Sequence, residues 1–290
     1  MSAPLLVLGA TGVVGCGVVE AAVEAARPVI AVARDAERLA RLRTRHAGAD
    51  LTVVARSIAG DAGADRLAAA LTRLRRPLSG VIAAVGGGSG RGRLLDQPVS
   101  ALRRELEDDL LLHLAAARHL LPLLAESQRP AAYVLIGGPG SEAPWAGYGR
   151  RSVGAAAQRM LASVLHDEAR AFGVRVQLLA VDAPACTERN RLHACPRWPT
   201  PYEIGRRAIE LVERAPAGRP AQAIVRFVAR GAATADPMHP AAAPPAGTGQ
   251  PPEPAQGEER RSGGSASPCL DDSRALLHTL ASTNRNEVSR

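Results

Sequence analysis

The sequence predicts an α/β fold, a doubly wound parallel sheet with helices on both faces. Short apolar runs typical of strands alternate with longer helical patterns along the first 230 residues. The first run leads into a glycine-rich turn, and a helical pattern follows that turn. Hydrophobic residues make up 46% of the chain but aromatic residues only 2%, so we expect a core of Ala, Leu and Val. Because crossovers between parallel strands are right-handed, this alternation favours the doubly wound arrangement.

About seven segments are expected to be strands, because each is a short run of aliphatic residues. The first is Leu-Leu-Val-Leu, and the later ones are similar runs rich in Val, Ile, Leu and Ala. In chain order the expected strands span 5–8, 29–33, 51–55, 80–85, 132–136, 174–181 and 221–228.

The segments between these runs are expected to be helices. Small residues lie along one face of the first helix, and the fourth is apolar over residues 110–124. In chain order the expected helices span 13–26, 36–46, 64–75, 99–124, 148–172 and 201–213.

The composition divides the chain at about residue 230. Residues 1–230 are expected to form one domain, and residues 231–290 a mostly disordered tail rich in Pro, Ala and Gly. Residues 232–263 show no periodicity, and such a stretch does not bury enough apolar surface to offset its ordering entropy. Residues 270–280 form a short amphipathic pattern that predicts a terminal helix.

The charge pattern argues against a nucleic-acid partner. The net charge is +8, all 36 basic residues are arginine, and these arginines are spread along the chain. Few aromatic residues are present to stack on bases, so biased composition is the preferred interpretation. With no apolar run of membrane-spanning length and no signal-peptide pattern, we expect a cytoplasmic protein without a membrane partner.

The four cysteines are expected to be free thiols. Cys16, Cys186, Cys195 and Cys269 form no CxxC pair, which is typical of a reducing compartment. The nearby trio of Cys186, His193 and Cys195 lacks a fourth ligand at a regular spacing. We therefore expect no metal site.

The glycine turn has the sequence Gly-Ala-Thr-Gly-Val-Val-Gly and lies between the first strand and the first helix. Glycine permits a tight turn, close approach of the backbone to a pyrophosphate, and close packing of the helix. The helix N-terminus presents free N–H groups to phosphates. The turn therefore predicts a Rossmann-type dinucleotide site. Its expected binding residues are Gly9, Thr11, Gly12, Val13, Val14 and Gly15.

The end of the second strand favours NADP(H) over NAD(H). A carboxylate there would hold the ribose hydroxyls of NAD, but Ala33 occupies the position and Arg34 follows. The guanidinium of Arg34 suits a 2′-phosphate. In the competing interpretation, Asp35 reaches the ribose and Arg34 is a solvated side chain.

The sequence resembles the short-chain dehydrogenase/reductase superfamily over residues 5–228. Segment 83–86 lies where many members have Asn-Asn-Ala-Gly, and segment 181–185 corresponds to their Pro-Gly segment near the nicotinamide, with Ala185 in place of glycine. The resemblance implies cofactor contacts by Ala84, Gly86, Pro184 and Thr187. Pro122 stands at the usual proline that ends the fourth helix.

The resemblance also implies catalytic residues, of which this sequence keeps few. Tyr148 stands where the family has its catalytic tyrosine, Ser152 stands in the lysine position, and Asp109 stands in the asparagine position. The serine position falls near Gly137 or Gly138. Arg151, three residues after Tyr148, is expected to stabilise a tyrosinate. The alternative is that Tyr148 is a helix-start residue in a pocket without chemistry.

The segment after the sixth strand, residues 186–200, is where this family places its substrate loop. Its arginines, Arg189, Arg191 and Arg197, indicate a small acidic substrate or, equally, a solvated basic loop. The resemblance further implies a homodimer or homotetramer through segments 110–124 and 152–164, unless those faces are buried within one subunit.

Three functions follow from these expectations. The first is an NADP(H)-dependent oxidoreductase that transfers hydride to or from a small carbonyl or alcohol substrate, with Tyr148 as proton donor. The second is a non-catalytic dinucleotide-binding sensor or scaffold. The third is a lyase or isomerase on the same fold. Fold alone does not separate them.

Overall fold

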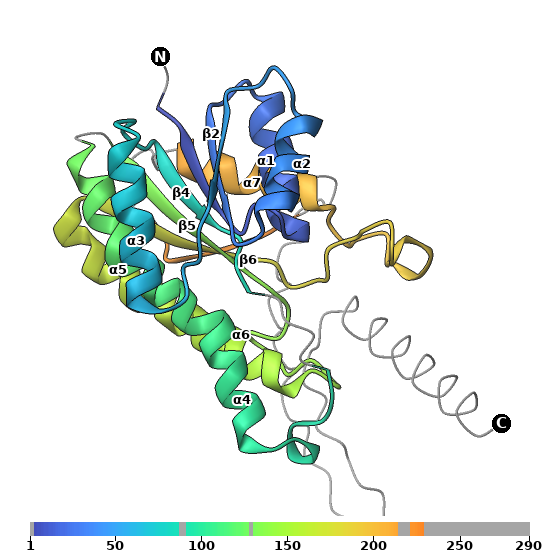
Figure 1. Cartoon of the computed structure of the whole chain (residues 1–290). Coiled ribbons are helices and arrows are strands. Elements are labelled where there is room, and N and C mark those ends of the chain that lie inside the picture. Colours follow the sequence, from blue (N-terminus) through green and yellow to red (C-terminus); the bar gives the residue numbers. More distant parts are fainter. Residues whose placement is uncertain (1–2, 87–90, 128–129, 214–220, 229–290) are drawn as a thin grey trace, which may run out of the picture.

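A computed structural model describes residues 3–86, 91–127, 130–213 and 221–228. It contains a seven-stranded parallel sheet with strand order β3-β2-β1-β4-β5-β6-β7 (Figure 1). The predicted doubly wound α/β fold is therefore confirmed. The strands are β1 (Leu5–Leu8), β2 (Val29–Ala33), β3 (Leu51–Ala55), β4 (Gly80–Ala83), β5 (Ala131–Gly137), β6 (Val174–Ala180) and β7 (Ile224–Arg226).

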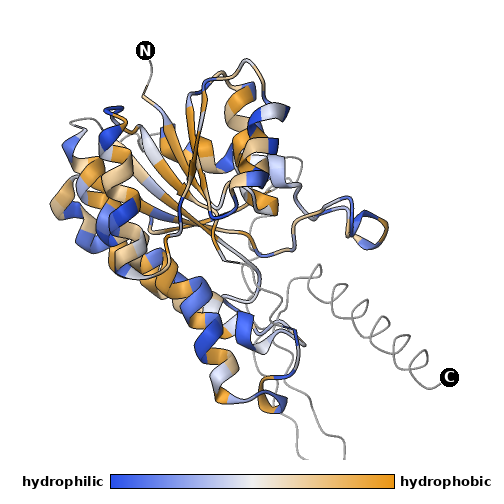
Figure 2. Cartoon of the chain, viewed as in Figure 1, coloured by the Kyte–Doolittle hydropathy of each residue, from blue (hydrophilic) through white to orange (hydrophobic). Residues whose placement is uncertain are grey.

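Helices cover both faces of the sheet. The helices are α1 (Val13–Glu24), α2 (Ala36–Arg45), α3 (Gly60–Arg73), α4 (Val99–Glu105), α5 (Leu111–Glu126), α6 (Gly149–Glu168) and α7 (Pro201–Glu213). One apolar cluster joins α1, α2 and α7 to one face, and a second joins α3, α5 and α6 to the other (Figure 1). Successive strand residues alternate between the clusters, as in β1, where Leu5 and Val7 face α1 and Leu6 and Leu8 face α3. The hydropathy colouring shows the apolar strands between these layers (Figure 2).

Several element boundaries differ from those expected. Helix α3 begins four residues early, because its first turn contains Gly60 and Gly63, residues more typical of loops. The helix expected over 99–124 is divided by a π-helical turn, Leu106–Leu110. Strand β7 is three residues long, where eight were expected.

Helices α1 and α7 cross at two glycines. A Cβ atom on Gly17 would lie 2.2 Å from the carbonyl carbon and oxygen of Pro201. A Cβ atom on Gly205 would lie 2.6 Å from the carbonyl oxygen of Gly17. Only glycine at both positions allows this approach, which fixes the helix after the glycine turn against the helix after the 181–200 segment.

The expected tail, residues 231–290 with its helix at 270–280, lies outside the described residues, and so does Cys269. Within the described ranges, every helix is too short or too polar to cross a membrane.

Candidate functional site

Two cavities adjoin at the carboxyl ends of β1 and β4. In doubly wound sheets, ligands bind at this point, where neighbouring strands connect in opposite directions. The larger cavity has a volume of about 570 Å³ and the smaller about 440 Å³. Both are lined by Gly12, Arg38, Ala84, Val85, Gly86 and Asp109. Together they form one elongated site on either side of the glycine turn.

The glycine turn has the conformation that an anion cradle requires. Gly9 has φ +74°, and a Cβ atom there would lie 2.3 Å from the carbonyl oxygen of Ala84. A Cβ atom on Gly15 would lie 2.1 Å from the carbonyl oxygen of Gly9. Helix α1 begins after Gly12, and no described side chain caps it. The amide groups of its first turn are therefore available to a phosphate group.

The expected residues of the turn lie at both cavities. Val13 and Val14 line the larger cavity, while Gly9 and Thr11 line the smaller one. Gly15 lines neither among the described residues, and its role is the close approach to Gly9.

Three arginines line the smaller cavity: Arg34 after β2, Arg38 on α2 and Arg56 after β3. Nη2 of Arg38 donates a hydrogen bond of 2.6 Å to the carbonyl oxygen of Thr11. Asp35 does not line this cavity, since its side chain caps α2 and accepts the backbone N–H of Arg38 at 3.0 Å. The cavity wall beside β2 is therefore cationic.

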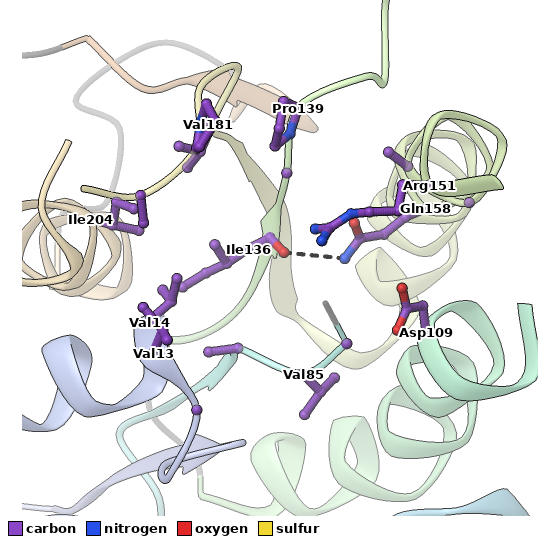
Figure 3. Close-up of a pocket in the computed structure, with 18 of the residues that line it drawn as sticks. Val13, Val14, Val85, Asp109, Ile136, Pro139, Arg151, Gln158, Val181 and Ile204 are labelled. Atoms are coloured by element: carbon purple, nitrogen blue, oxygen red, sulfur yellow. Dashed lines mark hydrogen bonds between the residues drawn. The ribbon is translucent and has the colours of Figure 1, made fainter. Parts of the chain in front are cut away.

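Helix α6 presents Arg151, Gly154, Ala155 and Gln158 to the larger cavity. These positions follow helical spacing, so they share one face. Figure 3 shows Arg151 and Gln158 reaching from α6 toward Ile136, with Val13, Val14 and Ile204 across the cavity. A guanidinium therefore occupies the end of the cavity where β5 ends.

Tyr148 and Ser152 are not among the described residues that line either cavity. Tyr148 precedes the first residue of α6, and its ring stacks on Trp145 with centroids 4.1 Å apart. The Ser152 hydroxyl accepts a hydrogen bond from the backbone N–H of Trp145 and donates one to the carbonyl oxygen of Tyr148. Both residues hold the loop before α6. Their expected catalytic roles stay predictions, which this placement does not favour.

Asp109 lines both cavities from the π-helical turn between α4 and α5. A Cβ atom on Gly86, which has φ +90°, would lie 2.9 Å from Oδ1 of Asp109. Glycine at position 86 is thus what allows the carboxylate to approach the end of β4.

A buried polar pair, His113 of α5 and Gln158 of α6, lines the larger cavity and was missed by the sequence analysis. Nε2 of Gln158 lies 2.8 Å from Nε2 of His113 and 3.3 Å from the carbonyl oxygen of Ile136. The amide donates to both, so the histidine proton is assigned to Nδ1. Burial lowers the pKa of His113 to about 4, and the Val85 backbone opposes this shift. The imidazole is neutral near pH 7.

Of the remaining expected residues, the cofactor contacts line the larger cavity and the loop arginines lie outside both cavities. Ala84, Gly86, Pro184 and Thr187 line the larger cavity. The Thr187 hydroxyl donates to Oδ1 of Asn190 at 3.0 Å. The loop arginines do not line either cavity among the described residues; these are Arg189, Arg191 and Arg197.

An ion-pair network holds the loop between β5 and α6. Glu142 of this loop pairs with Arg159 of α6 at 2.8 Å and with Arg226 of β7. Arg226 also lies 3.5 Å from Asp182. Burial raises the pKa of Asp182, although Arg226 counteracts this. The network connects three elements around the end of β5 and so restrains the loop that carries Trp145.

Comparison with known proteins gives matches in structure. No protein-family model and no curated protein matches the sequence. A short-chain type dehydrogenase/reductase from Mycobacterium ulcerans has a TM-score of 0.69 at 19% identity, over 78% of this chain and 88% of that one.

Two further solved structures contain a nicotinamide cofactor. The NADPH-bound short-chain oxidoreductase from Pseudomonas aeruginosa, described as containing an atypical catalytic center, has a TM-score of 0.67 at 22% identity, over 80% and 97% of the two chains. A short-chain dehydrogenase from Burkholderia cenocepacia in complex with NADP has a TM-score of 0.63 at 20% identity, over 79% and 89%. These likenesses show a common fold.

Proposed function

From the fold that this chain shares with short-chain dehydrogenases/reductases, we propose that it is an NADP(H)-dependent oxidoreductase of that superfamily. The observation that carries the proposal is the uncapped first turn of α1, which opens onto both cavities beside Gly12. A dinucleotide fits this arrangement, with its pyrophosphate at the turn and one half in each cavity.

The smaller cavity supports NADP(H) over NAD(H). Arg34, Arg38 and Arg56 line it, and guanidinium groups match the charge and geometry of a phosphate. The competing carboxylate, Asp35, caps α2. Two carboxylates, Asp108 and Asp109, also line this cavity. The bound cofactors of the Pseudomonas and Burkholderia structures agree with this preference.

The dinucleotide supplies or accepts a hydride at the carbon of a carbonyl or alcohol, and the oxygen gains or loses a proton. The chain must therefore orient that oxygen and stabilise its developing charge. Arg151 is placed for this role, since its guanidinium reaches the cavity beside Gly138, where an added Cβ atom would lie 3.6 Å from Nη2. Arginine does not release a proton near neutral pH, so we assign proton exchange to water.

The experiment that tests the function begins with fluorescence titration of NADPH and NADH. We expect tighter binding of NADPH and a loss of about tenfold or more in Arg34→Ala, as for a lost charge-assisted contact. Asp35→Ala should still bind NADPH more tightly than NADH, because this change removes only a helix cap outside the cavity. Absence of binding by either nucleotide would overturn the proposal.

Turnover of a panel of carbonyl compounds then separates the enzyme from the non-catalytic alternative. We expect Arg151→Gln to reduce kcat strongly and Tyr148→Phe to reduce it little, because Arg151 lines the cavity and Tyr148 does not. NADPH binding without turnover of any compound would favour the sensor. A large loss in Tyr148→Phe alone would restore the expected tyrosine mechanism.

We also propose a homo-oligomer formed through α5 and α6. Exposed apolar residues lie on both helices: Leu111, Leu114, Val153, Met160 and Val164. Other parts of the same segments, such as Leu120 and Leu124, are buried within the subunit. Light scattering after size exclusion should give twice or four times the chain mass, and Met160→Glu should shift it toward the monomer.

A further inference from the structure

Gln158 presents an oxygen acceptor to the larger cavity. The residue lines this cavity from α6 and is only 9% exposed. Its amide nitrogen lies 2.8 Å from Nε2 of His113 and is joined to the carbonyl oxygen of Ile136 (Figure 3). Within the described ranges, Oε1 has no hydrogen-bond partner, and it is not closed off from solvent. The small accessible part of this side chain therefore includes its carbonyl oxygen.

The amide group of Gln158 is fixed in this orientation. Exchanging its nitrogen and oxygen would set Oε1 against the carbonyl oxygen of Ile136, and these are two acceptors with no proton between them. Nε2 of His113 accepts the other amide hydrogen only while the imidazole is neutral. Burial lowers the pKa of His113 to about 4, so the imidazole stays neutral near pH 7. Gln158 is therefore only an acceptor toward the cavity, and its ligand must bring a donor.

Two small residues leave room for a ligand at this oxygen. A helical side chain leans toward the N-terminus of its helix, over the residues three and four positions earlier. For Gln158 these residues are Gly154 and Ala155, which line the same cavity. A Cβ atom on Gly154 would have only Cγ of Glu105 within reach, at 4.0 Å. The space beside Gln158 on α6 is therefore not filled by a neighbouring side chain.

The charges around the cavity favour a neutral donor. The described lining has two guanidinium groups, of Arg38 and Arg151, and one carboxylate, of Asp109, which leaves an excess of positive charge. An ammonium group is therefore disfavoured. A primary amide would pair with Gln158 through two hydrogen bonds, but both N–H groups of Gln158 are already used. A hydroxyl group needs only the one acceptor that remains.

We propose that Gln158 binds a hydroxyl group of the ligand in the larger cavity, with Oε1 as the acceptor, and that His113 positions the amide. This inference rests on the proposed function and identifies a further binding residue of the same site. Two molecules of the proposed reaction offer such a hydroxyl: the cofactor, on the ribose beside the nicotinamide, and an α-hydroxy carbonyl substrate. The contact with Gln158 is the same for both, and the experiment separates them.

The variants are Gln158→Met, Gln158→Glu and Gln177→Met. Methionine keeps the length of glutamine but removes the acceptor, whereas glutamate keeps an acceptor. Gln177 of β6 provides the matched control, because it is also buried and donates a hydrogen bond of 2.9 Å to the carbonyl oxygen of Gln222. It lines neither cavity among the described residues. Gln177→Met therefore removes a buried amide that has no contact with the ligand.

Binding measurements test the cofactor as the source of the hydroxyl. NADPH contains the ribose beside the nicotinamide, whereas adenosine 2′,5′-bisphosphate contains only the adenine half. We expect the dissociation constant of NADPH, measured by fluorescence, to rise about tenfold in Gln158→Met, as for one lost hydrogen bond. The dissociation constant of the bisphosphate, measured by calorimetry, should change by less than about twofold. Gln158→Glu should restore part of the NADPH affinity.

Turnover of substrate pairs tests the substrate as the source. Hydroxyacetone is compared with acetone, 1-hydroxy-2-butanone with 2-butanone, and 2-hydroxyacetophenone with acetophenone, so each pair differs by one hydroxyl group. If the substrate carries the hydroxyl, the ratio of kcat/KM within a pair should fall about tenfold in Gln158→Met. The ratio should be unchanged in Gln177→Met. Comparing ratios between variants removes the intrinsic difference in reactivity between the two ketones.

Either loss, when it is confined to the Gln158 variants, supports the proposal and identifies the source of the hydroxyl. Wild-type NADPH affinity in Gln158→Met, together with unchanged substrate ratios or with no turnover of these compounds, would overturn it. Equal losses in Gln177→Met, or equal losses for NADPH and the bisphosphate, would indicate a structural effect and would also overturn it.

A measurement on the wild-type protein covers the case in which Gln158→Met does not fold. NADPH analogues that lack the 2′ or the 3′ hydroxyl of the nicotinamide ribose are titrated beside the substrate pairs. If the protein is indifferent to every one of these hydroxyl groups, the proposal is wrong while the proposed function stands. Failure of the wild-type protein to bind NADPH would reject both.

Discussion

The crossing of α1 and α7 makes a definite prediction for Gly17→Ala. The new Cβ atom would lie 2.2 Å from the carbonyl carbon and oxygen of Pro201, whereas ordinary contacts begin at 3.4 Å. The two helices must therefore separate by about 1.2 Å, the shortfall in this van der Waals contact. The obstacle is backbone, so no rotamer change relieves it.

The expected loss of stability follows from two opposing terms. Overpacking of this kind costs about 1–3 kcal/mol, and we take the upper end because backbone must move. Alanine is favoured over glycine in a helix by about 1 kcal/mol. The net loss of about 2 kcal/mol corresponds to a decrease in Tm of about 4–8 °C for a domain of this size.

Thermal unfolding followed by circular dichroism measures this change, and Gly154→Ala is the control. Gly154 is also a helical glycine, but the nearest atom to its added Cβ is Cγ of Glu105 at 4.0 Å. That variant should gain up to about 1 kcal/mol. If Gly17→Ala raises Tm as Gly154→Ala does, the steric argument for the crossing is wrong.

Four further substitutions test individual side chains. Tyr133→Phe should raise the free energy of unfolding, measured with urea, by about 1 kcal/mol. The reason is that the Tyr133 hydroxyl is fully buried in β5 without a described hydrogen-bond partner. A less stable variant would show that the hydroxyl does form a hydrogen bond. Arg175→Met should lower stability by about 1–2 kcal/mol, because its guanidinium donates to the last carbonyl groups of α7 at 3.2 and 3.0 Å. Arg170→Met, which removes an exposed ion pair, should change stability by less than about 0.5 kcal/mol. The depressed pKa of His113 contributes stability that is present above pH 6.5 and is lost as the pH falls toward 4. The full effect on the free energy of unfolding is on the order of 3 kcal/mol. The free energies of unfolding measured by urea titration at pH 7 and at pH 4.5 should therefore differ more for the wild-type protein than for His113→Gln. Equal differences in the two proteins would show that His113 does not change its protonation on unfolding.

The fold was predictable because its signals are local. Each strand is a short aliphatic run, and the turn at Gly9, Gly12 and Gly15 joins the first strand to the first helix. The boundaries of α3 and β7 were less predictable, since glycines at a helix start and a short edge strand both weaken the local pattern.

The residues that line the larger cavity were harder to predict, because they depend on which face of α6 is turned toward that cavity. The sequence shows Tyr148 and Arg151 on the same candidate helix, but Tyr148 lies just before its first residue. Helical spacing from Arg151 would have identified Gln158, seven residues later on the same face. His113 carried no comparable signal, since its role depends on the packing of α5 against α6.

The π-helical turn Leu106–Leu110 makes the length of this segment as important as its side chains. Its hydrogen bonds span five residues in place of four, so it accommodates about one residue more than an α-helical turn. Removing one residue there would allow an uninterrupted α-helix and would rotate everything before the deletion by about 100° relative to α5. A single-residue deletion within 106–108 would therefore leave Asp109 in the sequence but turn a different face of α4 toward the rest of the fold.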